Sequence, residues 1–185
     1  MTDDVVAGPL DELWGQLVAL LECLEGTLDA NDAPAIRAFI APGGPPAWDV
    51  CCVEDGAEGQ AWVQVVEVAP TDAFPTPQTG VMRCDFGEWS VTVNVGVLRC
   101  ASTVDDNGSP PDADTLTEEA WKVQRDRVLI DSVIRCCFLG GDDPDIEAFV
   151  IGSWTPLGPG GGCVGGQQQL QFTSRRCGCG TDHEG

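Results

Sequence analysis

Basic residues are scarce in this chain. The 185-residue sequence has 9 Lys and Arg against 30 Asp and Glu, which gives a formal net charge of −21, and Lys122 is its only lysine. Neutralising the phosphates of duplex DNA needs clustered cations, and Arg175-Arg176 is the only adjacent pair. The composition therefore excludes a free-standing DNA-binding protein, and it disfavours binding to an anionic membrane surface for the same reason.

A basic N-terminal segment and a long apolar run are also missing. Met1–Asp4 lacks the positive start of a secretion signal, and no apolar run approaches the ~20 residues that span a bilayer. The charge-free stretch Ala148–Ser174 is interrupted by Pro156, Pro159 and several glycines, which excludes a membrane helix. We therefore expect a soluble, unprocessed protein that is made in a cytoplasm.

Histidine is almost absent, and this bears on catalysis. The only one, His183, is the third residue from the C-terminus and lies in a glycine-rich segment. Ser-His-Asp and Cys-His sites need a positioned imidazole, which a frayed terminus does not supply. Most of the acidic residues are expected to be solvated surface charge, so a hydrolase that uses carboxylates alone is the weakest alternative.

The ten cysteines stand out against these absences. A secreted miniprotein would use them as a disulfide framework, but this chain is longer and has no export signal. We therefore expect most of them to be small buried hydrophobes in a reduced, metal-free protein that keeps its fold. The adjacent pairs Cys51-Cys52 and Cys136-Cys137 are not expected to chelate, because strand neighbours point to opposite faces and helix neighbours lie about 100° apart.

Two patterns of potential ligands suggest metal sites. Cys177, Cys179 and His183 form C-x-C-x3-H, and Cys163 could add a fourth ligand for zinc, although the spacing matches no standard two-knuckle pattern. Asp142–Glu147 holds four carboxylates but lacks the calcium-loop spacing. A zinc-stabilised binding module stays open as an alternative, while the preferred interpretation has no metal and no cofactor.

Hydrophobic periodicity predicts two long helices. The first is expected to begin at Pro9 and to end at Asn31–Pro34, with one more turn possible over Ala35–Ile40. Thr115–Glu118 fits a capping box that opens a second helix, which is expected to run through Trp121 and Val128 to Cys137.

Five segments have the alternation or β-branched content of strands: Trp48–Val53, Ala61–Val68, Val81–Ala101, Ile146–Trp154 and Gln167–Thr173. The third is long, so a bend is expected near Asp85–Gly87. The order of elements predicts an α+β fold, with a mostly antiparallel sheet of about five strands packed against two long helices. We expect one domain over residues 1–175 and a flexible tail over residues 176–185.

The expected core joins the first helix to the longest strand. In that strand every second residue is apolar, so one face should be buried: Trp89, Val91, Val93, Val95 and Val97. The leucines of the first helix should pack on that face together with the Trp121 helix: Leu13, Leu17, Leu20 and Leu24.

The Gly/Pro-rich segment Gly152–Gly166 is the most unusual part of the sequence. It is a weak candidate for a phosphate-binding loop, because no Lys and no helix follow it. It is either a long flexible hairpin connection or an interaction loop that becomes ordered against a neighbouring subunit. The candidate interface residues are Trp154, Thr155, Pro156, Leu157, Gly158, Pro159, Gly160, Gly161, Gly162 and Cys163.

The order of these elements and this segment together resemble a known family. A leucine-rich N-terminal helix, the Val-alternating strand, a Thr-capped helix with Glu119-Ala120-Trp121, and the run from Gly152 to Gly166 are similar to tail terminator proteins of long-tailed phages, particularly those of actinobacteria. The resemblance spans most of residues 9–173, and only the Trp154–Gly166 segment is specific.

The resemblance implies a structural role without enzyme activity. Tail terminators form a ring, usually of six copies, that caps the tail tube and offers a surface to the head-closure or connector protein. They lie in the virion neck, assemble in the host cytoplasm, and let genomic DNA pass through the lumen without specific binding and without membrane contact. The acidic charge fits this role, because a negative lumen repels phosphates.

Another ring of the head-to-tail connector is the closest alternative. A head-closure or adaptor ring would share the charge and the partners. Adaptors are more helical and closure proteins are mostly small β-barrels, so two helices and five strands favour the terminator.

Overall fold

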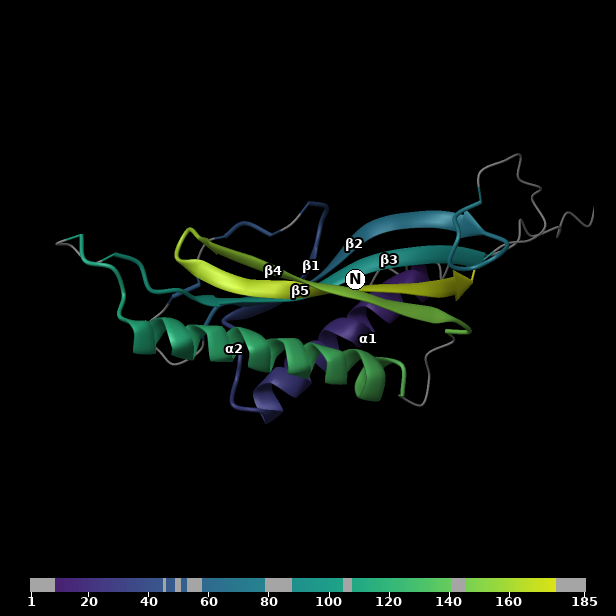
Figure 1. Ribbon diagram of the computed structural model, residues 1–185. Coiled ribbons are helices and arrows are strands. Elements are labelled where there is room, and N and C mark those ends of the chain that lie inside the picture. The colour runs from purple at the N-terminus through teal and green to yellow at the C-terminus, as the bar shows by residue number, and fades with distance from the viewer. Residues whose placement is uncertain are drawn as a thin grey trace, which may run out of the picture.

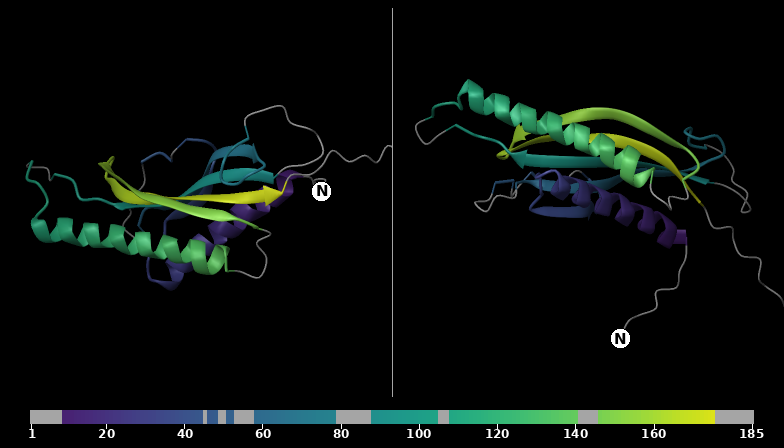
Figure 2. Two further views of the ribbon diagram at one scale, coloured as in Figure 1. Left: turned by 45° about the vertical axis from the view of Figure 1, so that its right-hand side comes forward. Right: turned by 90° about the horizontal axis from the view of Figure 1, so that it is seen from below.

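A computed structural model describes residues 9–44, 46–48, 51–52, 58–78, 88–104, 108–140 and 146–175. The elements in chain order are α1 (Pro9–Ala30), β1 (Arg37–Ala41), β2 (Gln60–Thr71), β3 (Glu88–Cys100), α2 (Ala113–Ser132), the π-helix η1 (Val133–Phe138), β4 (Phe149–Gly160) and β5 (Cys163–Arg175). Both helices lie on the same side of the sheet (Figures 1 and 2). None of the described helices is long and apolar enough to cross a membrane.

The expected α+β fold with five strands and two helices is confirmed, but two finer expectations are wrong. The strand order is β1-β2-β3-β5-β4, and the sheet is mixed because β1 runs parallel to β2 while the other neighbours pair antiparallel. The helices are also not both long, because α2 ends at Ser132 and the chain continues as the short η1.

The segment after α1 is a strand and not the further helical turn expected over Ala35–Ile40. Phe39 and Ile40 are strand-forming residues, and the parallel register of β1 runs from Arg37↔Gln60 to Ala41↔Gln64. Local strand preference and pairing with the buried strand β2 therefore both favour a strand here.

The expected strand Trp48–Val53 is absent where the chain is described. Trp48, Cys51 and Cys52 are irregular, and Val53 lies outside the described residues. The side-chain amide of Gln60 donates to the Ala47 carbonyl at 2.5 Å, which holds this segment over the outer face of the sheet, the face opposite the helices.

The described part of the long strand expected over Val81–Ala101 is β3. β3 is described over Glu88–Cys100, and Val81–Gly87, with the bend expected near Asp85–Gly87, lies outside the described residues. A β-bulge occurs in the partner strand, between Val65 and Glu67 of β2. Bulges increase local twist, so the curvature of the sheet is introduced there.

The N-cap of α2 differs from the expected capping box. Asp112 precedes the helix and its carboxylate accepts from the Thr115 backbone N–H at 2.8 Å, so Thr115 lies inside the first turn. These hydrogen bonds from Thr115 lower the pKa of Asp112 below its ordinary value, because they favour the charged carboxylate.

The core lies between the helices and the inner face of the sheet, the face toward the helices. The expected leucine–valine packing is confirmed: the α1 residues Leu17, Leu20 and Leu24 are buried in one cluster with Val91, Val93, Val95 and Val97. Trp121 does not belong to it, since this side chain is 60% exposed and α2 instead buries Val123, Asp126 and Ile130.

A buried ion pair joins the two layers at one end of the core. Arg99 of β3 and Asp126 of α2 are each 1% exposed, and the Arg99 Nε lies 2.7 Å from Asp126 Oδ2. The guanidinium also donates to the carbonyls of Ala33, Pro34 and Glu58 at 2.9–3.0 Å. This set of bonds fixes the end of α1, the approach to β2 and the middle of α2 relative to β3.

Truncation of the α1 core should destabilise the fold. Leu17 is 4% exposed, so we expect Leu17→Ala to lower the free energy of unfolding by ~2–5 kcal/mol in urea titrations. The exposed Glu25 on the same helix provides a control, and Glu25→Ala should change it by less than ~0.5 kcal/mol. Equal small effects of both substitutions would show that α1 is not docked on the sheet.

Removal of the buried carboxylate should be more costly than removal of an exposed one on the same helix. Asp126→Ala leaves Arg99 buried and unpaired, so we expect a loss of ~3–5 kcal/mol. Asp131 pairs with Arg135 at 2.9 Å with both side chains about half exposed, and Asp131→Ala should cost less than ~1 kcal/mol. Thermal or urea unfolding of the two variants measures the difference, and a cost for Asp126→Ala as low as that for Asp131→Ala contradicts the role given to the buried pair.

Candidate interface at the β4–β5 hairpin

The Gly/Pro-rich segment forms a hairpin of two paired strands and not the expected long loop, although the register of the pair shifts between Ile151 and Trp154 and between Leu157 and Gly160. β4 continues to Gly160 and β5 begins at Cys163, so Gly161 and Gly162 alone make the turn. Their φ angles of 57° and 76° lie in the left-handed region that glycine adopts without strain. Figure 1 shows this turn at the same end of the sheet as the start of α2.

Several glycines of the hairpin provide space for tryptophan rings. A Cβ at Gly166 would overlap with the indole of Trp154, and one at Gly160 would lie 2.7 Å from the Trp48 ring. Trp154 is half-buried and packs against the main core. The large ring therefore covers its own neighbouring strand, and the glycines that suggested flexibility are positions of close packing.

The candidate interface residues divide into two groups. Trp154, Leu157 and Cys163 pack inward, Leu157 and Cys163 in a small cluster with Trp62, Leu98 and Cys51. Gly160 and Gly162 are half-buried. The exposed members are Thr155, Pro156, Gly158, Pro159 and Gly161.

Two further exposed apolar residues extend this surface, and sequence reasoning did not single them out. Phe149 is 48% exposed and Val150 is 42% exposed, both at the start of β4. Because both residues lie in a predicted strand, burial of their side chains was favoured. β4 is an edge strand, however, and edge strands leave such side chains exposed. The absence of charge from Ala148 onward was the available signal. Phe149 and Pro156 pair with Phe172 and Gly166 on the face toward the helices, whereas Val150 and Thr155 pair with Gln171 and Gln167 on the outer face. We call Phe149, Val150, Thr155, Pro156 and Pro159, which lie along this edge on both faces, the hairpin surface.

The end of the hairpin is cross-linked, contrary to the expectation of free thiols. Disulfides join Cys51 to Cys163 and Cys52 to Cys100, and Cys100 and Cys163 are direct register partners at the end of the β3·β5 ladder. The adjacent residues Cys51 and Cys52 can therefore both bond to cysteines at this end of the ladder. They lie in an irregular segment, where the alternation of side chains along a strand does not apply. We call these four residues the cysteine tetrad.

A third disulfide lies in the helical layer. Cys23 of α1 is bonded to Cys137 of η1, across a sequence separation of 114 residues. Cys136 is exposed and is the free cysteine among the described residues. Six cysteines therefore act as cross-links and not as small buried hydrophobes, because the fold brings residues far apart in sequence within bonding distance.

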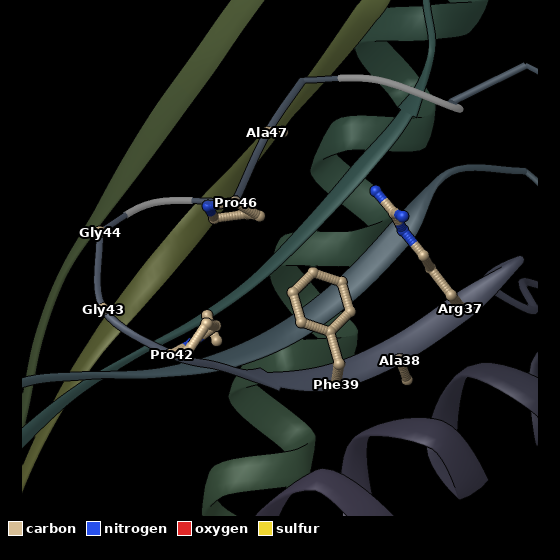
Figure 3. Close-up of a pocket in the computed structure, with 9 residues that line it drawn as sticks. Arg37, Ala38, Phe39, Pro42, Gly43, Gly44, Pro46 and Ala47 are labelled. Atoms are coloured by element: carbon tan, nitrogen blue, oxygen red, sulfur yellow. The ribbon is translucent and has the colours of Figure 1, made fainter.

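A cavity of about 550 Å³ is lined by β1 together with Pro42–Gly44, Pro46 and Ala47 (Figure 3). Arg37 is the charged residue among its described lining. Its guanidinium donates to Gln60 Oε1 at 2.7 and 3.0 Å and lies 5.5 Å from the centre of the Phe39 ring. The cation is therefore used within the chain, and the cavity offers a mostly apolar surface.

The metal sites suggested by sequence are not brought together by the described residues. Cys163 is bonded to Cys51, while Cys177, Cys179 and His183 lie outside the described residues, as do Asp142–Asp145. In this disulfide-bonded form, the described part of the chain has no group of three or more His, Cys, Asp or Glu side chains placed to hold a metal ion.

The chain matches no protein-family model and no curated protein. Its function must therefore be argued from its own surfaces and chemistry.

Substitution of the glycine beneath Trp154 should destabilise the hairpin. In Gly166→Ala the new methyl group overlaps with the indole and should cost ~1–3 kcal/mol of unfolding free energy. Gly26 of α1 has open space around it, so Gly26→Ala should be neutral or stabilising by up to ~1 kcal/mol. Urea unfolding separates the two, and a neutral Gly166→Ala would mean that Trp154 does not pack on β5.

Proposed function

We propose that this chain is a structural protein of a phage tail: a tail terminator that forms a ring on the tail tube. The resemblance of the sequence to tail terminators is the starting point. A five-strand sheet with two helices on one side is compatible with the small α/β domain which that resemblance implies, and the tail-terminator-like fold is part of the proposal.

The observation that carries the proposal is the uncharged hairpin surface on a strongly acidic chain. The net charge is −21, yet no charged residue occurs between Phe149 and Ser174. Exposed side chains of the hairpin surface are apolar or small, and such surfaces are normally covered by a partner. Repulsion between the negative charges on the rest of the chain opposes contact between copies, so the contact is most favourable where it includes the uncharged hairpin surface.

The contact should be made by side chains more than by strand addition. β4 lies at the sheet edge, but Pro156 and Pro159 lack the backbone N–H that a new strand would need, and the register shifts between Ile151 and Trp154. In a ring of more than two copies, the hairpin surface of one copy must pack on a different surface of the next copy. Such a head-to-tail interface closes a ring when its rotation allows, and the resemblance implies six copies.

The acidic charge suits the lumen of such a ring. DNA is repelled by negative walls and can pass without sticking, which fits genomic DNA moving through without specific binding. Repulsion between copies also disfavours isolated rings, so the tail tube protein should act as template and the head-closure or connector protein as the second partner. No catalytic residue, cofactor or membrane contact enters this proposal.

The disulfides are compatible with a place in the virion neck after assembly in a host cytoplasm. Disulfides persist on virion surfaces and other oxidising locations, whereas a cytoplasm keeps thiols reduced. The cross-links would then form after particles leave the reducing compartment.

Charges placed on the hairpin surface should prevent ring formation. In Val150→Lys/Thr155→Lys both substituted side chains are exposed, so the fold should be retained while the neighbour must bury two cations. We expect negative-stain electron microscopy of assembled tails to show uncapped, overlong tubes without heads.

The matched control is Ala120→Lys/Gln124→Lys, which places the same two charges on exposed positions of α2. It should give tails of normal length that join heads. Normal tails with the hairpin variant, shown to be folded by circular dichroism, would contradict the proposal.

A further inference from the structure

The cysteine tetrad has an arrangement that two independent cross-links do not require. Cys51 and Cys52 are adjacent in the chain, and their bonding partners Cys163 and Cys100 are direct partners across two strands. Side chains of such a register pair lie on the same face of the sheet. Four sulfur atoms from three segments therefore converge on one spot of the outer face.

The backbone around the tetrad is held by bonds other than the disulfides. Ala101 N donates to Gly162 O at 2.8 Å and closes the end of the β3·β5 ladder, while Gly59 N donates to Cys51 O at 2.9 Å. Trp48 packs over Gly160 and Gly161. Reduction of both disulfides would thus leave four thiols close to their present places.

We propose that the reduced tetrad is a zinc site in which Cys51, Cys52, Cys100 and Cys163 are the four ligands. Four thiolates in tetrahedral arrangement are the donor set of structural Zn²⁺ sites. A Zn–S bond of ~2.3 Å places tetrahedral ligands about 3.8 Å apart. Cα–Cα distances of 5.5 Å for Cys51–Cys163 and 4.7 Å for Cys52–Cys100 allow that separation by rotation about χ1.

The surroundings favour a closed structural site. Cys51 is 3% exposed and Cys163 is fully buried, and both pack with Trp62, Leu98 and Leu157. Cys100 is half-buried and Cys52 is exposed, which leaves an entry path for the metal and for a reductant. Cys52 Sγ lies 3.5 Å from Gly162 O, at the hairpin turn.

The change between the two forms is balanced. Each disulfide accepts two electrons and two protons from a dithiol reductant, which is oxidised to its own disulfide. The four thiols then lose four protons to solvent as they bind Zn²⁺, giving a zinc tetrathiolate of net charge −2. Zinc and the two disulfides are therefore alternative ways to hold the hairpin end, one in reducing and one in oxidising surroundings.

Titration with Co²⁺, a spectroscopic substitute for Zn²⁺, tests the proposal on the full chain. After anaerobic reduction we expect one Co²⁺ per chain, with thiolate charge-transfer and tetrahedral d–d absorption that Zn²⁺ abolishes. The oxidised chain should show neither. Absence of tetrahedral Co²⁺ absorption from the reduced chain overturns the proposal.

Paired variants locate the ligands. Cys51→Ser/Cys163→Ser should weaken Co²⁺ binding by at least about 100-fold, because two of four ligands are lost. Cys23→Ser/Cys137→Ser removes the remote disulfide and should leave the affinity unchanged. Cys177→Ser/Cys179→Ser should also leave it unchanged, and a loss with that variant would assign the metal to the C-x-C segment instead.

Protection from alkylation needs no substitution and covers the case in which a variant fails to fold. In the reduced chain, Zn²⁺ should slow alkylation of all four tetrad thiols at least about tenfold by peptide mass spectrometry, while the exposed Cys136 serves as internal reference. Equal protection of Cys136, or none at the tetrad, rejects the site. The outcome is independent of the proposed ring, which the tail assay tests separately.

Discussion

The buried guanidinium of Arg99 is the constraint on which the arrangement of both layers depends. Its donors meet the Asp126 carboxylate and three backbone carbonyls, so a charge in the core is fully paired. The carbonyls belong to the segments that leave α1 and enter β2, which the sequence separates from Arg99 by 41 to 66 residues. Any shift of α2 along the sheet would separate the Asp126 carboxylate from the guanidinium and leave a buried charge without its counter-ion, which is costly.

Contacts between tryptophan rings and glycines are the second constraint on the packing of the sheet. They occur on the outer face of the sheet and along the β4–β5 hairpin. Gly96 lies beneath the Trp62 ring, Gly166 beneath Trp154, and Gly160 beneath Trp48. A side chain at any of these glycines would push the ring away from the sheet. The glycine content of the chain is thus partly a packing requirement, and it permits large aromatic rings to cover strands that would otherwise lie open.

Hydrophobic periodicity predicted the elements in which buried residues recur at a regular spacing. It failed for the segments whose structure is set by tertiary contacts. The α1 leucines and the β3 valines were correctly placed because each set has one buried face. The hairpin was expected to be a loop because glycine and proline are read as breakers, and nothing local reveals that Trp154 lies over Gly166. The disulfides were missed because the absence of an export signal was taken to imply reduced thiols, and pairings over more than 100 residues leave no trace in spacing.

The distribution of charge links the fold to the proposed assembly. Exposed carboxylates such as Glu22 and Glu25 lie on α1, which has no basic residue, whereas α2 and η1 also carry cations and the β4–β5 hairpin has no charged residue before Arg175. The basic residues of α2 and η1 are Lys122, Arg125, Arg127 and Arg135. A neighbouring copy that approached α1 would meet like charge, whereas it would meet no charged side chain along β4. Repulsion therefore orients the contact before any side chain packs, since charge complementarity governs specificity more than affinity. A cross-linked or metal-bound hairpin end then presents that one permissive surface in a fixed shape, which lowers the entropy lost on assembly.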